Sequence, residues 1–218
     1  MTVLAELEQA IEVGDRATAA LRTRDAISAD LDAQTILDAM TRAMAVVGDQ
    51  FQHNEIFVPE MLIAARAMKE AMAVLEPVLV NAGIRPEATA VIGTVQGDLH
   101  DIGKNLVAMM WRGARLEVID LGTDVPPARF VEAAREHGAR LVGVSALLTT
   151  TMIGMKDVVQ AVRGANLDGV RVVVGGAPLT QEFADAIGAD GYARDAGAAV
   201  AVARQILGLD TAPVAQGS

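Results

Sequence analysis

The sequence predicts an α/β protein in two parts, an N-terminal four-helix bundle followed by an open parallel sheet of five strands. Residues 1–82 carry apolar side chains three or four positions apart, which is typical of helices that share one core. Beyond them, short apolar runs alternate with helical segments, which favours parallel strands joined by right-handed crossovers. We therefore expect a helical part at 1–84, an α/β part at 85–210 and a flexible tail at 211–218.

Two breaks divide the helical part, and they lie at Gly14-Asp15 and at 28–32. Asp15 and Asp32 are expected to cap the helices that follow, and Pro59 suits the start of the fourth helix. The expected core positions of the third and fourth helices are Ile36, Met40, Met44, Val47 and Phe51, then Met61, Ala65, Met68, Met72, Leu75 and Leu79. Pro77 lies inside the last run and predicts a kink near the end of that helix.

The second part begins after a helix stop and linker at 81–86. The expected strands are 89–95, 116–121, 141–145, 170–174 and 191–193, and the expected helices are 103–113, 126–137, 152–163, 180–187 and 196–207. An open sheet of this kind binds its ligand beyond the carboxyl ends of its strands.

The composition excludes several classes of protein. The 218 residues contain no cysteine, so disulfides, thiolate-ligated clusters and cysteine nucleophiles are excluded. A net charge of −10 without a basic stripe is unfavourable for binding nucleic acid. No apolar run reaches the length of roughly 18 residues that a membrane span needs, and the N-terminus has no basic segment before an apolar stretch. These features predict a cytoplasmic protein.

The residues that could carry chemistry follow the expected strands, at 97–105, 145–151 and 175–177. His100 stands between Asp98 and Asp101, just before a glycine that opens a helix, and such an imidazole can ligate a metal while a carboxylate holds its other nitrogen. One imidazole does not hold a bare transition metal tightly. The metal would therefore arrive in its own macrocycle, with the protein supplying one axial ligand.

These motifs resemble a known family. Asp98-x-His100-x-x-Gly103, followed by Ser145-x-Leu147 and Gly175-Gly176, is similar to the cobalamin-binding signature of methionine synthase, the methyl-corrinoid proteins and the coenzyme B12 mutases. The helical part resembles the methionine synthase cap through the residues at 48–51 and 57–61, and the mutases lack that cap. The resemblance covers nearly the whole chain and implies a Rossmann-like, flavodoxin-like cobalamin-binding domain beneath a helical cap.

The resemblance assigns a role to each matching residue. His100 corresponds to the lower axial cobalt ligand, and Asp98 to the carboxylate that binds it. Thr151 stands where methionine synthase has the serine that ends this relay. The other residues implied to contact the cofactor are Gly97, Leu99, Asp101, Ile102, Gly103, Ser145, Leu147, Thr149, Gly175, Gly176 and Ala196, together with Phe51 and Val58 of the cap. Ser145 and Thr149 would line the slot for the nucleotide tail of the cofactor. Gly175, Gly176 and Ala196 would form the walls of that slot.

The implied function is methyl transfer on cobalt, with the cofactor alternating between methylcobalamin and cob(I)alamin. The implied partners are a substrate-specific methyltransferase, an acceptor methyltransferase that uses tetrahydrofolate or a thiol, and a reductive activase. The chain has no recognisable donor or acceptor site, so we expect a carrier subunit without catalytic activity of its own. The cap would swing about residues 81–88 to admit each partner.

Three alternatives are weighed. A cobalamin-dependent sensor joins a similar cap and fold to a DNA-binding module, and the sequence lacks a basic helix-turn-helix before the cap. A small mutase subunit is disfavoured by the cap itself. A nucleotide-binding flavodoxin-like domain would need a phosphate-cradling loop, but Asp98 and Asp101 would repel phosphate.

His53 and His137 are interpreted as structural residues at helix ends.

Overall fold

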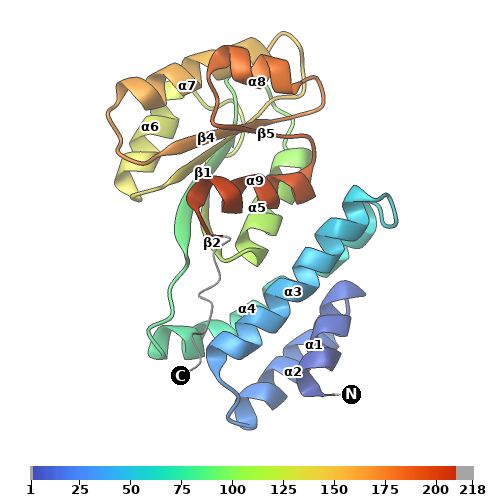
Figure 1. The fold of residues 1–218 in the computed structure, drawn as a ribbon. Helices are drawn as coiled ribbons and strands as arrows, with labels where there is room; N and C mark the ends of the chain where they lie inside the picture. The colour runs from blue at the N-terminus through green and yellow to red at the C-terminus, as the bar shows by residue number, and fades with distance from the viewer. Residues whose placement is uncertain (1, 210–218) are drawn as a thin grey trace, which may run out of the picture. The chain divides into compact units, whose positions relative to one another are not determined.

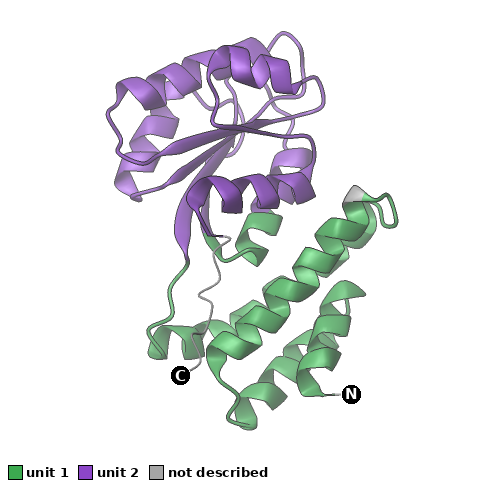
Figure 2. Cartoon of the chain, in the orientation of Figure 1, with its two compact units in different colours: residues 1–86, 109–116 green, residues 87–108, 117–218 purple. Residues whose placement is uncertain are grey.

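The computed structural model describes residues 2–209, so the tail predicted at 211–218 lies outside the described residues. Two compact units make up the chain (Figure 2), the first formed by residues 1–86 and 109–116 and the second by residues 87–108 and 117–218. The chain therefore passes between the units after residues 86, 108 and 116. The sequence did not indicate that residues 109–116 would group with the helical part.

Unit 1 contains four helices that precede the first strand (Figure 1), namely α1 (Val3–Glu12), α2 (Arg16–Ser28), α3 (Ala33–Gln52) and α4 (Val58–Asn81). Both predicted caps are confirmed. Asp15 Oδ1 accepts a hydrogen bond from the Thr18 N–H at 3.0 Å, and Asp32 Oδ2 accepts one from the Thr35 N–H at 3.0 Å. These carboxylates satisfy N–H groups that have no partner within the helix.

The expected core of α3 and α4 is buried with two exceptions. Phe51 and Met72 are only half-buried, and Ala71 lies fully buried beside the latter. Pro59 is the second residue of α4, because Val58 already begins the helix. The helix continues through Pro77 to Asn81.

Unit 2 contains a five-stranded parallel sheet, as predicted. Its strands are β1 (Ala88–Thr94), β2 (Leu116–Asp120), β3 (Leu141–Ser145), β4 (Arg171–Gly175) and β5 (Gly191–Ala193). They lie in the order β2-β1-β3-β4-β5, so the direction of strand addition reverses at β1 and β3. This order is that of flavodoxin-like folds, which bind ligands at the reversal point.

The helices that join the strands are α5 (Ile102–Gly113), α6 (Pro127–Glu136), α7 (Met155–Gly164), preceded by the short 3₁₀ turn η1 (Met152–Gly154), α8 (Gln181–Ile187) and α9 (Ala196–Leu207). Within unit 2, α6 and α7 cover one face of the sheet and α9 covers the other (Figure 1). No helix among residues 2–209 is long and apolar enough to cross a membrane.

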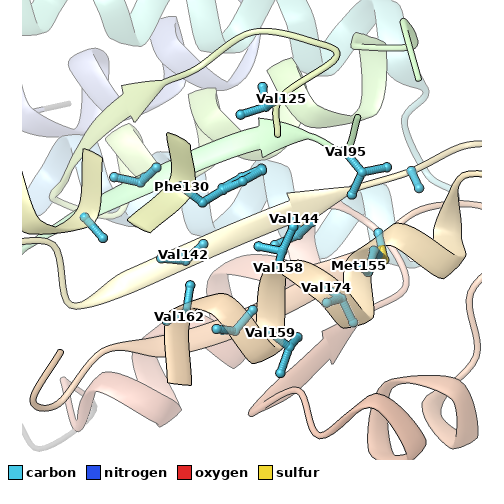
Figure 3. Close-up of a cluster of buried hydrophobic side chains, with 14 of the residues drawn as sticks. Val95, Val125, Phe130, Val142, Val144, Met155, Val158, Val159, Val162 and Val174 are labelled. Carbon is cyan, nitrogen blue, oxygen red and sulfur yellow. The ribbon is translucent and has the colours of Figure 1, made fainter. Parts of the chain in front are cut away.

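Small aliphatic side chains fill the core between the sheet and the helices α6 and α7 (Figure 3). Phe130 of α6 is fully buried and lies over Gly93 of β1, where an added Cβ would come within 2.9 Å of the phenyl ring. Val142 and Val144 of β3 face the same core as Val158 and Val162 of α7. This packing fixes β1 and β3 side by side, and the candidate loops follow those two strands.

Candidate functional site

The loop after β1 carries the predicted metal ligand. It runs from Val95 to Asp101, between the end of β1 and the first residue of α5. Gly97 has a φ of +83°, a left-handed conformation that glycine adopts without steric cost. This turn folds the loop back, so that Asp98 points into the protein and His100 lies half-exposed.

Asp98 and His100 are directly hydrogen-bonded. His100 Nδ1 lies 2.7 Å from Asp98 Oδ1, and the His100 main-chain N–H donates to the same oxygen at 3.0 Å. The Asp98 side chain is fully buried, whereas 49% of the His100 side chain is exposed. An ionised carboxylate only accepts hydrogen bonds, so Nδ1 carries a proton, and in the neutral ring Nε2 keeps its lone pair.

The second oxygen of Asp98 binds the loop after β3. Oδ2 accepts hydrogen bonds from the N–H of Leu147 at 2.8 Å, the N–H of Leu148 at 3.3 Å and the hydroxyl of Thr151 at 2.6 Å. Burial by itself would raise the pKa of Asp98, but the hydrogen bonds from Thr151, Leu147 and His100 outweigh it and lower that pKa well below its usual value. Asp98 is therefore a carboxylate at neutral pH.

The extra methyl group of Thr151 does not prevent this contact. The Thr151 methyl group has room next to Gly97, since even a Cβ added at Gly97 would lie 3.8 Å from it, which is ordinary van der Waals contact. The threonine hydroxyl thus reaches Asp98, as the serine it stands for would.

Exposed apolar side chains lie on the two loops that meet at Asp98, close to His100 in the sequence and in the loop bound to Asp98. Leu99 is 73% exposed and Ile102 is 71% exposed, on either side of His100 in the sequence. Across the loops, Leu147, Leu148 and Ile153 are also exposed apolar side chains. Exposed apolar residues gathered around one polar ligand group are typical of a surface that a largely apolar partner covers.

Gly103 supports the same interpretation. It lies in the first turn of α5, and a Cβ added there would meet no atom within 4 Å. Neither its packing nor its backbone conformation requires glycine, although glycine destabilises a helix relative to alanine. The fit of these residues to a flat macrocycle is therefore good: an available nitrogen, apolar side chains around it, and a bare backbone next to it.

Gly175, which ends β4, and Gly176, which follows it, are both required by the fold itself. A Cβ at Gly176, whose φ is +141°, would lie 1.9 Å from the Ala146 carbonyl oxygen, and one at Gly175 would lie 2.9 Å from the Ala193 carbonyl oxygen. Both positions thus let neighbouring main chains approach closely. Their predicted role as walls of the tail slot remains a prediction.

The remaining predicted residues lie on several elements. Ser145 ends β3 and is paired with Gly175, Thr149 is exposed in the loop after β3, and Ala196 is buried at the start of α9. Phe51 and Val58 belong to unit 1, on α3 and at the first residue of α4. Asp101 lies next to the start of α5, where its carbonyl accepts a hydrogen bond from the Asn105 N–H at 2.8 Å.

Three further side chains hold this region, and the sequence motifs did not point to them. The Thr94 hydroxyl donates to the His100 carbonyl at 2.9 Å, and Asp124 Oδ1 accepts from the Gly97 N–H at 2.7 Å. Lys104 is buried and binds Asp120 at 2.5 Å. A threonine at the end of a largely apolar strand, just before the His100 loop, is the signal that could have pointed to Thr94.

The other two histidines lie at helix ends, as expected. His53 follows α3, with Nδ1 2.9 Å from the Asp49 carbonyl oxygen, and His137 follows α6, with its N–H bonded to the Ala133 carbonyl.

Comparison with known proteins connects this geometry to a family. Residues 88–201 match a B12 binding domain, and residues 3–76 match a second domain of that description. A corrinoid protein of Desulfitobacterium hafniense (strain Y51) is 43% identical over 213 residues, which cover 95% of this chain and 99% of the relative. Trimethylamine corrinoid protein 1 of Methanosarcina acetivorans is 38% identical over 209 residues, covering 94% and 97%.

Two solved structures are similar over both units. A cobalamin-binding protein from Desulfitobacterium hafniense DCB-2 has a TM-score of 0.80 and 30% identity, covering 94% of this chain and 99% of that one. The methanol:cobalamin methyltransferase complex from Methanosarcina barkeri contains a chain with a TM-score of 0.82 and 29% identity, covering 96% and 81%. The site geometry, both matched domains and these full-length relatives agree, and the protein belongs to the corrinoid protein family, with cobalamin as its cofactor.

Proposed function

We propose that this chain is the methyl-carrying subunit of a multi-component methyltransferase system. The observation that carries the proposal is the buried, ionised Asp98, which holds Nδ1–H of His100 and leaves Nε2 available on an apolar surface. That is the arrangement an imidazole needs in order to be the axial ligand of a metal that is already held by a macrocycle.

Bound cobalamin would supply the methyl-transfer chemistry between a donor and an acceptor, and this chemistry belongs to the cofactor. The chain orients and encloses it. His100 would hold the cobalt through Nε2, and Asp98 would fix the ring tautomer and make that nitrogen more basic. Thr151 and the N–H groups of Leu147 and Leu148 hold Asp98 in place. The exposed leucine and isoleucine side chains would be buried by the corrin and exclude water from the ligating bond.

The partner that supplies the methyl group is a substrate-specific methyltransferase. Relatives of this chain are named as trimethylamine and dimethylamine corrinoid proteins, and one structural neighbour belongs to a methanol methyltransferase complex. We therefore place the donor among methylamines and methanol. The acceptor methyltransferase, using tetrahydrofolate or a thiol, and a reductive activase complete the proposed system.

Cofactor binding is tested by reconstituting the purified chain with hydroxocobalamin and removing unbound cofactor. The wild type should retain a coloured corrin with the spectrum of a histidine-ligated form. His100→Ala should give a base-off spectrum and weaker binding, whereas His53→Ala should behave as the wild type. A wild-type protein that emerges colourless contradicts the proposal.

Methyl transfer is tested by reducing the reconstituted protein and mixing it with methyltransferases specific for trimethylamine, dimethylamine or methanol. One donor and enzyme pair should convert the cofactor spectrum to that of methylcobalamin, and a thiol or tetrahydrofolate methyltransferase should reverse the change. If the cofactor binds but no pair methylates it, a cobalamin sensor becomes the better interpretation.

A further inference from the structure

Two side chains outside the proposed cofactor-contacting set hold the His100 loop by its main chain. Thr94 is fully buried, and its hydroxyl donates to the His100 carbonyl at 2.9 Å. Asp124 Oδ1 accepts the Gly97 N–H at 2.7 Å, and the Asp124 N–H donates to the Asp98 carbonyl at 3.0 Å. Main-chain polar groups of three loop residues are thus bound by two residues outside the loop after β3.

Thr94 is itself fixed in the sheet. It ends β1, its N–H donates to the Gly122 carbonyl at 3.0 Å, and its carbonyl accepts from the Val125 N–H at 2.9 Å. Its hydroxyl therefore has a defined position. Because the hydroxyl is buried, the carbonyl that it binds would lose a partner that water does not readily replace if the hydroxyl were removed.

Asp124 is fixed by its backbone conformation. Its φ is +54°, in the left-handed region that aspartate and asparagine tolerate better than most residues. In this conformation both its N–H and its carboxylate reach the same pair of residues, Gly97 and Asp98. Because Val125, the next residue, is bridged to Val95, the loop after β2 is anchored to the loop after β1.

We propose that Thr94 and Asp124 are positioning residues for the axial ligand, and this rests on the proposed role of His100 as that ligand. They form the loop around Asp98 and His100 before the cofactor arrives. The imidazole then points outward without a further cost in ordering the chain on binding. The sequence motif contains the proposed ligand His100 and its carboxylate Asp98. Thr94 and Asp124 determine the positions of both.

Two pairs of variants separate the hydrogen bonds from the shape of the side chains. Thr94→Val keeps the β-branched shape without the donor, whereas Thr94→Ser keeps the hydroxyl. Asp124→Gly removes the acceptor and tolerates the positive φ, whereas Asp124→Asn keeps both an acceptor oxygen and the conformation. Asp30, an exposed aspartate of unit 1 with a φ of +55°, provides Asp30→Gly as a matched control for the loss of an acid at such a position.

The first measurement is electron paramagnetic resonance of the reconstituted cobalt(II) form with nitrogen-labelled histidine. The ratio of histidine-bound to histidine-free cobalt should fall by about tenfold in Thr94→Val and in Asp124→Gly, at the lower end of the range for substitutions behind a metal ligand. Thr94→Ser, Asp124→Asn and Asp30→Gly should keep the wild-type ratio. Wild-type ratios in both Thr94→Val and Asp124→Gly overturn the proposal.

The second measurement uses the apoprotein and does not depend on cobalamin. Nitrogen NMR at alkaline pH, with His100→Ala to assign the signal, reports which ring nitrogen carries the proton. The wild type should show His100 mainly protonated on Nδ1, and Asp124→Gly should lower that fraction while Asp124→Asn restores it. An unchanged fraction in Asp124→Gly contradicts the positioning role even if the chain binds no cobalamin, so this failure is distinct from that of the proposed function.

Discussion

At the scale of single residues, Asp98 joins two loops through its two oxygens. Oδ1 binds His100 in its own loop, and Oδ2 binds Leu147, Leu148 and Thr151 in the loop after β3. Its charge is therefore required for the fold of the site as well as for the ligand. The pKa of Asp98 is lowered for the same reason, because each of these donors favours the ionised form.

Asp98→Asn should destabilise the apoprotein at pH 7 by about 1–3 kcal/mol, because an amide NH₂ would face donors that need an acceptor. The folded-state pKa lies below the unfolded value of about 3.9, so the stabilisation is full above pH ~4 and is lost as pH falls toward the folded-state pKa. Urea unfolding at pH 7, 5 and 3 should show the difference between wild type and variant shrinking only at pH 3. A difference that is as large at pH 3 as at pH 7 would contradict this account.

Gly103→Ala should separate folding from cofactor binding. The added methyl meets no atom within 4 Å and the position is helical, so the apoprotein should be stabilised by up to about 1 kcal/mol. Cobalamin binding should weaken, because the methyl occupies space next to the proposed corrin surface. Thermal unfolding and hydroxocobalamin titration measure the two effects, with Gly164→Ala, also a helical glycine with open space, as control. A gain in stability with unchanged affinity would show that Gly103 does not face the cofactor.

At the scale of elements, an ion pair between a buried lysine and a partly exposed aspartate connects α5 to the end of β2. Lys104 lies one residue beyond Gly103, its side chain is 2% exposed, and it binds Asp120, which also accepts the Gly122 N–H at 2.9 Å. The pair therefore ties the helix that follows His100 to the start of the loop that contains Asp124. The position of α5 relative to β2 therefore depends on this contact.

Asp120→Ala should destabilise the protein by about 3–5 kcal/mol, because it leaves the Lys104 ammonium buried without its partner. Lys104→Met should cost less, since a side chain of similar length fills the space without a charge. Chemical denaturation of both variants tests the order. If Lys104→Met is the more harmful, the ion pair contributes net stability beyond the avoidance of a buried charge.

At the scale of the whole molecule, the site is formed where strand order reverses, between β1 and β3. The helical unit is not a simple N-terminal segment, because the last part of α5 groups with it and includes Trp111, the protein's one tryptophan, which is buried. A swing of the helical unit about residues 81–88, as the sequence suggests, must also be accommodated near residues 108 and 116, where the chain crosses between units.

Phe51 and Val58 are predicted to shield the methyl group on cobalt, and photolysis of the methylated protein tests this. Phe51→Ala should speed the loss of the methyl group in light, because a smaller side chain leaves the upper face more open. Val58→Leu should slow it. Leu21→Ala, at an exposed position of α2, is the control. Equal photolysis rates in all variants would mean that neither residue covers the methyl group.

The sequence by itself determined the elements of both units and the nature of the site. Apolar spacing distinguished bundle helices from buried strands, because each pattern reflects a local geometry of the chain. Spacing also placed Asp98 and His100 on one loop, and the expected strand ends agree with the observed ones within one or two residues. The motif around His100 and its resemblance to the cobalamin-binding signature predicted the ligand, because a short motif is a local feature of the chain.

Only the tertiary structure decided which distant residues complete the site. The hydrogen bonds from Leu147 to Asp98, from Thr94 to the His100 carbonyl and from Gly97 to Asp124 depend on the order of strands in the sheet. The close approach of Gly176 to Ala146 has the same origin. Apolar periodicity reports which side of an element is buried but not which element covers it. For that reason the sequence could propose His100 as a cobalt ligand, and only the assembled sheet could show what holds that residue in place.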